Sequence, residues 1–150
     1  MTEKKSMFIG EYAHSIDVKK RLALPSKFRG ELGGKVVVTR GLDDCLFVYP
    51  MKVWEVLAEK LGSLPVGEAG TRSFIRLMLS GATDVEMDSQ GRILLPEYLK
   101  DYAGLSKDVT VAGLFNRLEV WDTQKWKTYK TDAEKNSGEI AEQLGKLGVY

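Results

Sequence analysis

The sequence predicts an α+β fold that is mainly β, made of two tandem hairpin–helix–hairpin repeats with peripheral helices. Three observations lead to this prediction. The string DVKKRLALP at residues 17–25 returns as DSQGRILLP at residues 88–96, which is 71 positions later (88 − 17). Apolar and polar residues alternate before both copies, as is typical of strands. The likeness holds over about 40 residues, and self-similarity of that length predicts architecture before any single motif does.

The repeat also sets the expected organisation of the chain. At 150 residues the chain is long enough to bury a core without disulfides or metals, whereas one repeat of about 40 to 50 residues would be marginal alone. We therefore expect the two copies to share one core. The segments expected within this single interlocked unit are a first repeat at residues 7–53, a helical spacer at 54–81, a second repeat at 82–125 and a helical tail at 126–150.

Turn residues and strand alternation divide the first repeat into a hairpin, a helical turn and a second hairpin. The elements expected are a strand from residue 7, a turn at 17–20, a strand at 21–24, a helical turn at 25–29, and a hairpin with strands at 35–39 and 45–49. In the first strand Tyr12, His14 and Ile16 share one face. Pro25 favours the start of the helical turn, and Gly30 is placed to end it.

Apolar residues at helical spacing predict two helices between the copies. The first starts at Pro50 and is broken at residues 62–67. The second spans about residues 71–80, and its apolar side is expected to hold Phe74, Ile75, Met78 and Leu79. The second repeat is then expected to contain a strand at 83–87, a turn from Asp88, a helix at 97–103, strands at 109–112 and 118–121, and a helical tail from residue 122.

Cysteine content and hydropathy place the chain among soluble proteins of a reducing compartment, and we expect a cytoplasmic location. Cys45 is the single cysteine, which excludes an internal disulfide, and its apolar surroundings favour a small buried residue over a reactive thiol. No apolar run approaches the ~20 residues needed to span a bilayer, and the start of the chain lacks the apolar region of a signal peptide. Residues 1–6 read as a polar lead-in with no assigned role.

The net charge of +1 is unevenly spread along the chain. Residues 1–40 carry nine Lys/Arg and four Asp/Glu, a net of +5, and residues 41–150 carry 13 and 17, a net of −4. Positive charge is thus concentrated around the first copy of the repeated turn. A local basic face can attract nucleic acid even when the whole chain is close to neutral.

The repeated turn has two interpretations. Its aspartate can accept hydrogen bonds from backbone N–H groups two or three residues on, and the arginine four residues later can pair with that carboxylate. An arginine held in this way keeps donors free for guanine O6 and N7 or for a phosphate. The alternative is a solvated surface ion pair with little energetic effect. Duplication of the charged positions together with the apolar ones gives the functional interpretation as much weight as the surface ion pair, and both stay open on the residues alone.

Other function classes find less support in the sequence. Two symmetry-related aspartates resemble the pair of aspartic proteases, but those enzymes need a glycine two residues after each aspartate, where this chain has Lys19 and Gln90. With His14 and Cys45 as the single histidine and cysteine, neither a zinc site nor a nucleophilic triad is expected. We expect no enzyme activity, no metal and no cofactor. A ring-forming scaffold whose basic turns bind an acidic protein remains the alternative.

Six short strings occur together in this chain: MFIGEY at residues 7–12, the turn at 17–21, TRGLD at 39–43, YP at 49–50, SGAT at 80–83 and DSQGR at 88–92. Together they resemble the MraZ family, and the match covers roughly residues 7 to 130. The resemblance implies an AbrB-like swapped-hairpin barrel with both halves in one chain, and assembly into rings. It also implies a nucleoid-associated regulator that binds double-stranded promoter DNA by sequence and controls the division and cell-wall gene cluster containing its own gene.

Carried over by residue, the family's Asp-x-x-x-Arg motif falls on the two repeated turns. We expect the arginines to read bases in the major groove and the lysines to contact phosphates. The DNA-binding residues expected are Arg21, Arg92, Lys19, Lys20, Lys27 and Gln90. The residues expected to orient the turns are Asp17, Asp88 and Gly91. The family commonly has glycine before the arginine, where the first copy has Lys20, and a positive φ there would strain a lysine.

Overall fold

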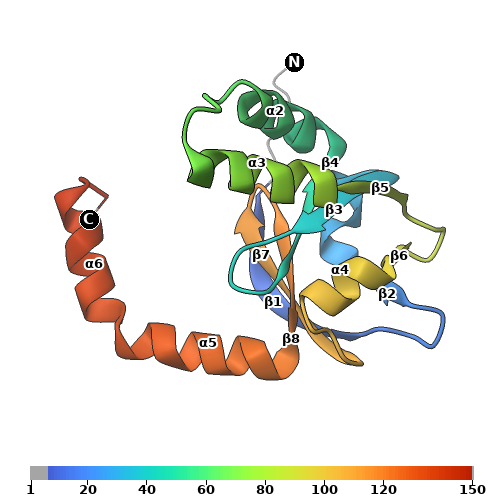
Figure 1. Ribbon diagram of the computed structural model, residues 1–150. Coiled ribbons are helices and arrows are strands. Elements are labelled where there is room, and N and C mark those ends of the chain that lie inside the picture. Colours follow the sequence, from blue (N-terminus) through green and yellow to red (C-terminus); the bar gives the residue numbers. More distant parts are fainter. Residues whose placement is uncertain (1–6, 150) are drawn as a thin grey trace, which may run out of the picture.

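The computed structural model describes residues 7–149 and shows a β-rich body with a helical arm (Figure 1). The first repeat and the spacer contain β1 (Phe8–Ser15), β2 (Arg21–Ala23), the 3-10 turn η1 (Ser26–Phe28), α1 (Arg29–Leu32), β3 (Lys35–Arg40), β4 (Leu46–Pro50), α2 (Met51–Gly62) and α3 (Ala69–Gly81). The remainder contains β5 (Thr83–Glu86), β6 (Arg92–Leu94), α4 (Glu97–Tyr102), β7 (Asp108–Phe115), β8 (Leu118–Asp122), α5 (Thr123–Lys135) and α6 (Ser137–Lys146).

The strands pair across the two repeats. A six-stranded antiparallel sheet has the order β1-β7-β8-β4-β3-β5, and a second sheet pairs β2 with β6. The outer strands β1 and β5 each pair with a strand of the other repeat, so the arms of the two turns are exchanged. The predicted α+β, mainly β, swapped-hairpin fold is confirmed.

This exchange corrects one detail of the sequence prediction. Residues 7–24 were expected to form a hairpin whose two strands pair with each other, but β1 pairs with β7 and β2 pairs with β6. A single bridge between Ile16 and Leu22 joins the two arms next to the turn. Alternation determines which face of a strand is buried and leaves its hydrogen-bonding partner open, so the turn was predicted correctly and the pairing was not.

The main core draws on both repeats. Phe8, Leu22 and Phe28 from the first repeat are buried with Ile93 and Leu99 from the second. The rings of Phe8 and Phe28 meet edge to face with centroids 5.2 Å apart. The predicted face of β1 is also seen, because Tyr12 packs against this cluster and Ile16 is buried in it.

A second, smaller core lies where α2 and α3 cover β3 and β4. It contains Phe47, Tyr49, Met78 and the predicted buried thiol Cys45, whose pKa is raised mainly by burial. Of the residues predicted on the apolar side of α3, Met78 is buried in this core and Leu79 packs against it, whereas Phe74 is 37% exposed.

The short helix after Pro25 also ends later than predicted. Gly30 was expected to end it, but Gly30 lies inside α1 (Arg29–Leu32). Gly33 follows the helix with φ +77° and donates its N–H to the carbonyl of Arg29 at 3.2 Å. Gly33, and not Gly30, therefore ends the helix, with a positive φ that favours glycine.

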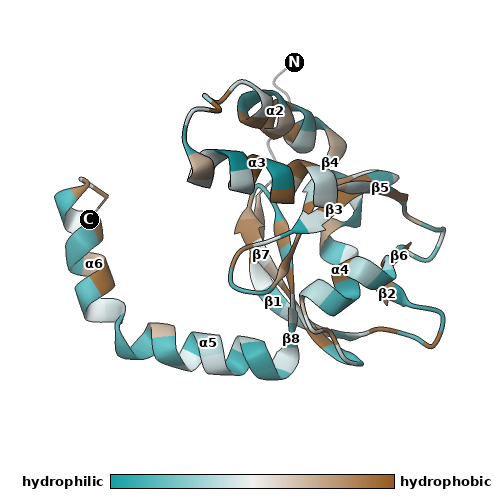
Figure 2. Cartoon of the chain, viewed as in Figure 1, coloured by the Kyte–Doolittle hydropathy of each residue, from teal (hydrophilic) through white to brown (hydrophobic). Residues whose placement is uncertain are grey.

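The C-terminal helices form an arm that leaves the body. Figure 1 shows α5 running outward from β8 and α6 turning upward at its far end. Trp126 and Tyr129 at the start of α5 pack on Trp121, but neither helix contains a buried residue. Figure 2 shows a largely hydrophilic α5 and brown patches on α6. Within residues 7–149, no helix has the length and hydrophobicity to cross a membrane.

Candidate nucleic-acid interface

The first turn is held by the carboxylate of Asp17. Its Oδ1 accepts hydrogen bonds from the backbone N–H groups of Lys19 and Arg21, both at 2.9 Å. Its Oδ2 accepts from Nε of Arg21 at 2.8 Å. The carbonyl of Asp17 accepts from the N–H of Lys20 at 3.0 Å and closes the turn. The carboxylate thus fixes both the backbone and the guanidinium.

The second turn repeats this geometry atom for atom. Oδ1 of Asp88 accepts from the N–H groups of Gln90 and Arg92 at 2.9 Å, and Oδ2 accepts from Nε of Arg92 at 2.8 Å. The carbonyl of Asp88 accepts from the N–H of Gly91 at 3.0 Å. In both copies the aspartate therefore orients the arginine through the same hydrogen bonds.

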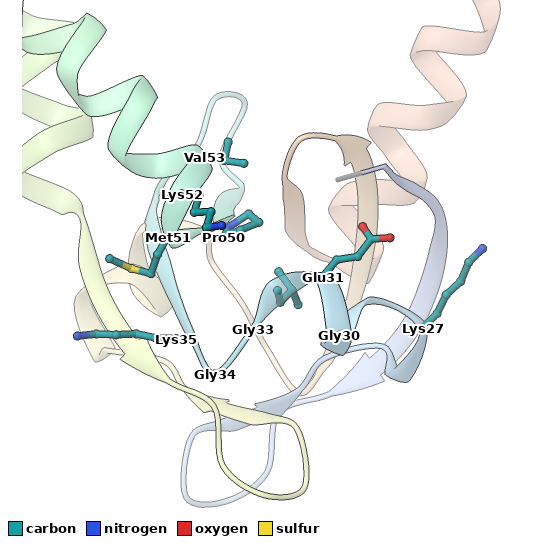
Figure 3. A pocket seen from close by; sticks show the side chains of 11 residues that line it. Lys27, Gly30, Glu31, Gly33, Gly34, Lys35, Pro50, Met51, Lys52 and Val53 are labelled. Atoms are coloured by element: carbon teal, nitrogen blue, oxygen red, sulfur yellow. The ribbon is translucent and has the colours of Figure 1, made fainter. Parts of the chain in front are cut away.

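The two turns are joined into one unit. The N–H of Leu24 donates to the carbonyl of Gly91 at 2.9 Å, and the N–H of Leu95 donates to the carbonyl of Lys20 at 2.9 Å. Each turn is therefore anchored by the strand end of the other repeat, next to the β2–β6 ladder. Figure 1 and Figure 3 show both turns at the same end of the body.

The residue before each arginine has a left-handed backbone. Gly91 has φ +76° and Lys20 has φ +62°, so the first turn adopts the same backbone conformation as the second with a lysine in place of glycine. A left-handed conformation costs an L-residue about 1–2 kcal/mol. The side chain of Lys20 forms an ion pair with Glu97 at the start of α4. This pair joins the first turn to the second repeat.

In both turns the aspartate is stabilised in its charged form, and part of the guanidinium group stays exposed. The pKa values of Asp17 and Asp88 are lowered, mainly because the backbone N–H of the following arginine donates to each carboxylate. The side chains of Arg21 and Arg92 are 31% and 26% exposed. Nε is the guanidinium nitrogen engaged in each of these pairs, which leaves the Nη edge of each fork available to a ligand.

The predicted site residues do not all lie at the turn tips. Lys19 and Gln90 are exposed at equivalent positions of the two turns. Lys27 lies instead on η1, at the rim of an open groove of about 740 Å³, and Figure 3 shows its side chain pointing outward at the side of the molecule. The rest of the groove is lined by α1, the residues that lead into β3 and the start of α2, and it contains no residue of the turns.

Arg29 is a residue of this region that the sequence analysis did not identify. Its side chain lies against Gly91, where an added Cβ would collide with Nε, Cζ and Cδ of the arginine. Nε of Arg29 donates to the carbonyl of Leu24 at 3.0 Å. The offset of 71 residues that relates the two turns also relates Arg29 to Lys100. Both repeats therefore carry a cation at this position, and this is the sequence signal that could have identified Arg29.

In the part of the chain that the structure describes, no group of three His, Cys, Asp or Glu side chains could hold a metal ion. His14 lies near Arg29, and its pKa is lowered first by burial and then by the charge of that arginine. An uncharged His14 beside a cation fits a packed position in β1.

Comparison with known proteins agrees with the internal repeat. The family model described as "MraZ protein, putative antitoxin-like" matches twice, at residues 7–77 and 78–146. A curated protein of Halothermothrix orenii named "Transcriptional regulator MraZ" is 50% identical over 143 residues, covering 95% of this chain and all of the relative. Proteins with the same name are 49% identical in Acetivibrio thermocellus, over the same shares, and 51% identical in Natranaerobius thermophilus, over 92% of this chain and 96% of the relative.

Proposed function

Because the chain belongs to the MraZ family, we propose that it is a transcriptional regulator that binds specific sequences in double-stranded DNA. One observation supports this most strongly: Arg21 and Arg92 are held by identical carboxylate contacts in two turns that are hydrogen-bonded to each other. Two guanidinium groups at a fixed relation can engage two positions of one groove. Surface ion pairs without a ligand need no such duplication.

In the proposed mechanism the two arginines enter the major groove and read guanine. The geometry favours arginine there because a bidentate contact to O6 and N7 needs a planar fork, and Asp17 and Asp88 hold that fork in one orientation. Gln90 stands where the first turn has Lys19, and an amide suits the edge of adenine. The two turns would then read different bases.

Lysines position the protein on the phosphates in this mechanism. Lys19 at the first turn is exposed and has the most direct access to a strand. Lys20 contributes less net charge because Glu97 pairs with it. Lys27 lies farther along the side of the molecule and would meet a phosphate outside the contact of the turns. Such contacts raise affinity without specifying sequence.

Self-association belongs to the same proposal. One pair of turns covers a short stretch of DNA, and linked copies on spaced repeats would raise affinity through effective concentration. The arm supports assembly, because α5 and α6 bury no residue within the chain while Ile140 and Leu147 are 44% and 76% exposed. We propose a ring-shaped homo-oligomer in the cytoplasm, associated with the nucleoid and acting on promoter repeats of the division and cell-wall cluster that contains its own gene.

The test is fluorescence-anisotropy binding to DNA upstream of its own gene and to a shuffled duplex over a salt series. We expect the wild type to prefer its own upstream DNA. Arg21→Ala and Arg92→Ala should each cost about 1–3 kcal/mol on that DNA and relax discrimination. Arg76→Ala on α3 is the matched control, because Arg76 is exposed away from the turns. Equal binding to both duplexes by all proteins would favour the scaffold function instead.

A further inference from the structure

The two turns differ in charge although they share one geometry. Residues 17–21 carry a net charge of +2, whereas residues 88–92 are neutral because Ser89, Gln90 and Gly91 stand where the first turn has Val18, Lys19 and Lys20. A turn that approaches DNA without a neighbouring cation is attracted less strongly to the phosphates. By sequence, the second turn therefore has less positive charge for phosphate contacts than the first.

The structure places a cation beside that neutral turn. Arg29 lies directly against Gly91, in the space that any side chain at position 91 would occupy. Its Nε donates to the carbonyl of Leu24 at 3.0 Å, and the N–H of Leu24 donates to the carbonyl of Gly91 at 2.9 Å. This chain of bonds fixes the guanidinium of the first repeat to the turn of the second.

The surroundings of the first turn are arranged differently. There the turn itself supplies the cation, Lys20, and the helix of the other repeat supplies the acid Glu97 that pairs with it. At the second turn the helix region supplies the cation Arg29 and the turn supplies glycine. Within residues 7–149, the interactions of Arg29 include a carbonyl partner but no carboxylate partner.

We infer that Arg29 is a phosphate-binding residue of the second turn, supplied by the first repeat to provide the cation that residues 89–91 lack. The inference rests on the proposed function and extends its DNA-binding face. Arg29 is half-buried beside the turn and not at its tip, so it is placed to meet the backbone of the DNA while Arg92 meets the bases. Glycine at position 91 leaves room for this contact, and it also suits the positive φ of the backbone there.

The test compares Arg29→Gln with the matched control Lys100→Gln, which removes one charge at the equivalent position of the other repeat. Binding of the full chain to its own upstream DNA and to the shuffled duplex is measured by anisotropy over a salt series. Arg29→Gln should lower the slope of log K against log salt by about 0.9 per engaged protomer, which is about eightfold in affinity at 0.1 M salt. The loss of affinity should be the same on both duplexes, since phosphate contacts do not depend on base sequence.

Two further results complete the test. Arg29→Lys should keep the wild-type slope, which separates loss of charge from damage to the fold, and Lys100→Gln should match the wild type. An Arg29→Gln slope equal to that of the wild type would overturn this inference and leave the proposed function standing. A wild type that shows no preference for its own upstream DNA would overturn the proposed function, and the role of Arg29 with it.

Discussion

Lys20 and Gly91 occupy the same place in two turns with the same hydrogen bonds. Both have a left-handed backbone, with φ +62° and +76°, and the carbonyl of each accepts a hydrogen bond from the other repeat, at Leu95 and Leu24 respectively. The turns are thus hydrogen-bonded to the other repeat through a position whose positive φ favours glycine. Only the second turn has glycine there. This difference gives the first two predictions.

Lys20→Gly should stabilise the protein by about 1 kcal/mol. Glycine relieves the left-handed strain, and the lost ion pair with Glu97 is a half-exposed surface pair worth little. The measurement is the free energy of unfolding from urea titration. Lys20→Ala is the control, because alanine loses the ion pair and keeps the strain. Equal stability of the two variants would show that position 20 carries no strain.

Gly91→Ala should destabilise the protein by more than the roughly 1–2 kcal/mol of a left-handed residue alone. The added Cβ would collide with the side chain of Arg29, which then has to leave Leu24. A double-mutant cycle with Arg29→Ala measures the coupling. The cost of Gly91→Ala should be smaller in the Arg29→Ala background. An unchanged cost would mean that Arg29 does not occupy this space in solution.

Acid should weaken the turns through their aspartates. The folded pKa values of Asp17 and Asp88 lie below the ordinary value, so their contribution to stability is present above an unfolded pKa of about 3.9 and is lost as pH falls through the folded pKa. The difference in urea midpoint between the wild type and Asp17→Asn/Asp88→Asn should therefore be larger at pH 7 than at pH 3. A difference that grows on acidification would contradict the assigned contacts.

The arm should control assembly without controlling the fold of the body. Replacing the exposed Ile140 and Leu147 with glutamine should reduce the mass measured by light scattering, because neither side chain belongs to a core cluster of residues 7–149. Glu142→Gln with Lys146→Gln is the matched control on the same helix. The circular dichroism of both variants should match the wild type. An unchanged mass for the first variant would place the subunit interface elsewhere.

Comparison of sequence and structure shows which features local pattern could predict. Alternation and turn residues predicted the strand around Tyr12, the Asp17 turn and the burial of Cys45, because each depends on neighbours in the chain. The exchange of strands and the contact of Arg29 with Gly91 could not be predicted in this way. Both depend on how the second repeat docks on the first, which periodicity does not encode.

Replacing guanine by 7-deazaguanine removes the N7 acceptor and tests most directly whether Arg21 and Arg92 read guanine. Anisotropy is measured on upstream DNA with and without the substitution, for the wild type and for Arg21→Ala/Arg92→Ala. The account predicts that the wild type loses about 1–3 kcal/mol per contacted base on substituted DNA, while the double variant binds both duplexes alike. Equal binding of the wild type to both duplexes would contradict base reading by these arginines.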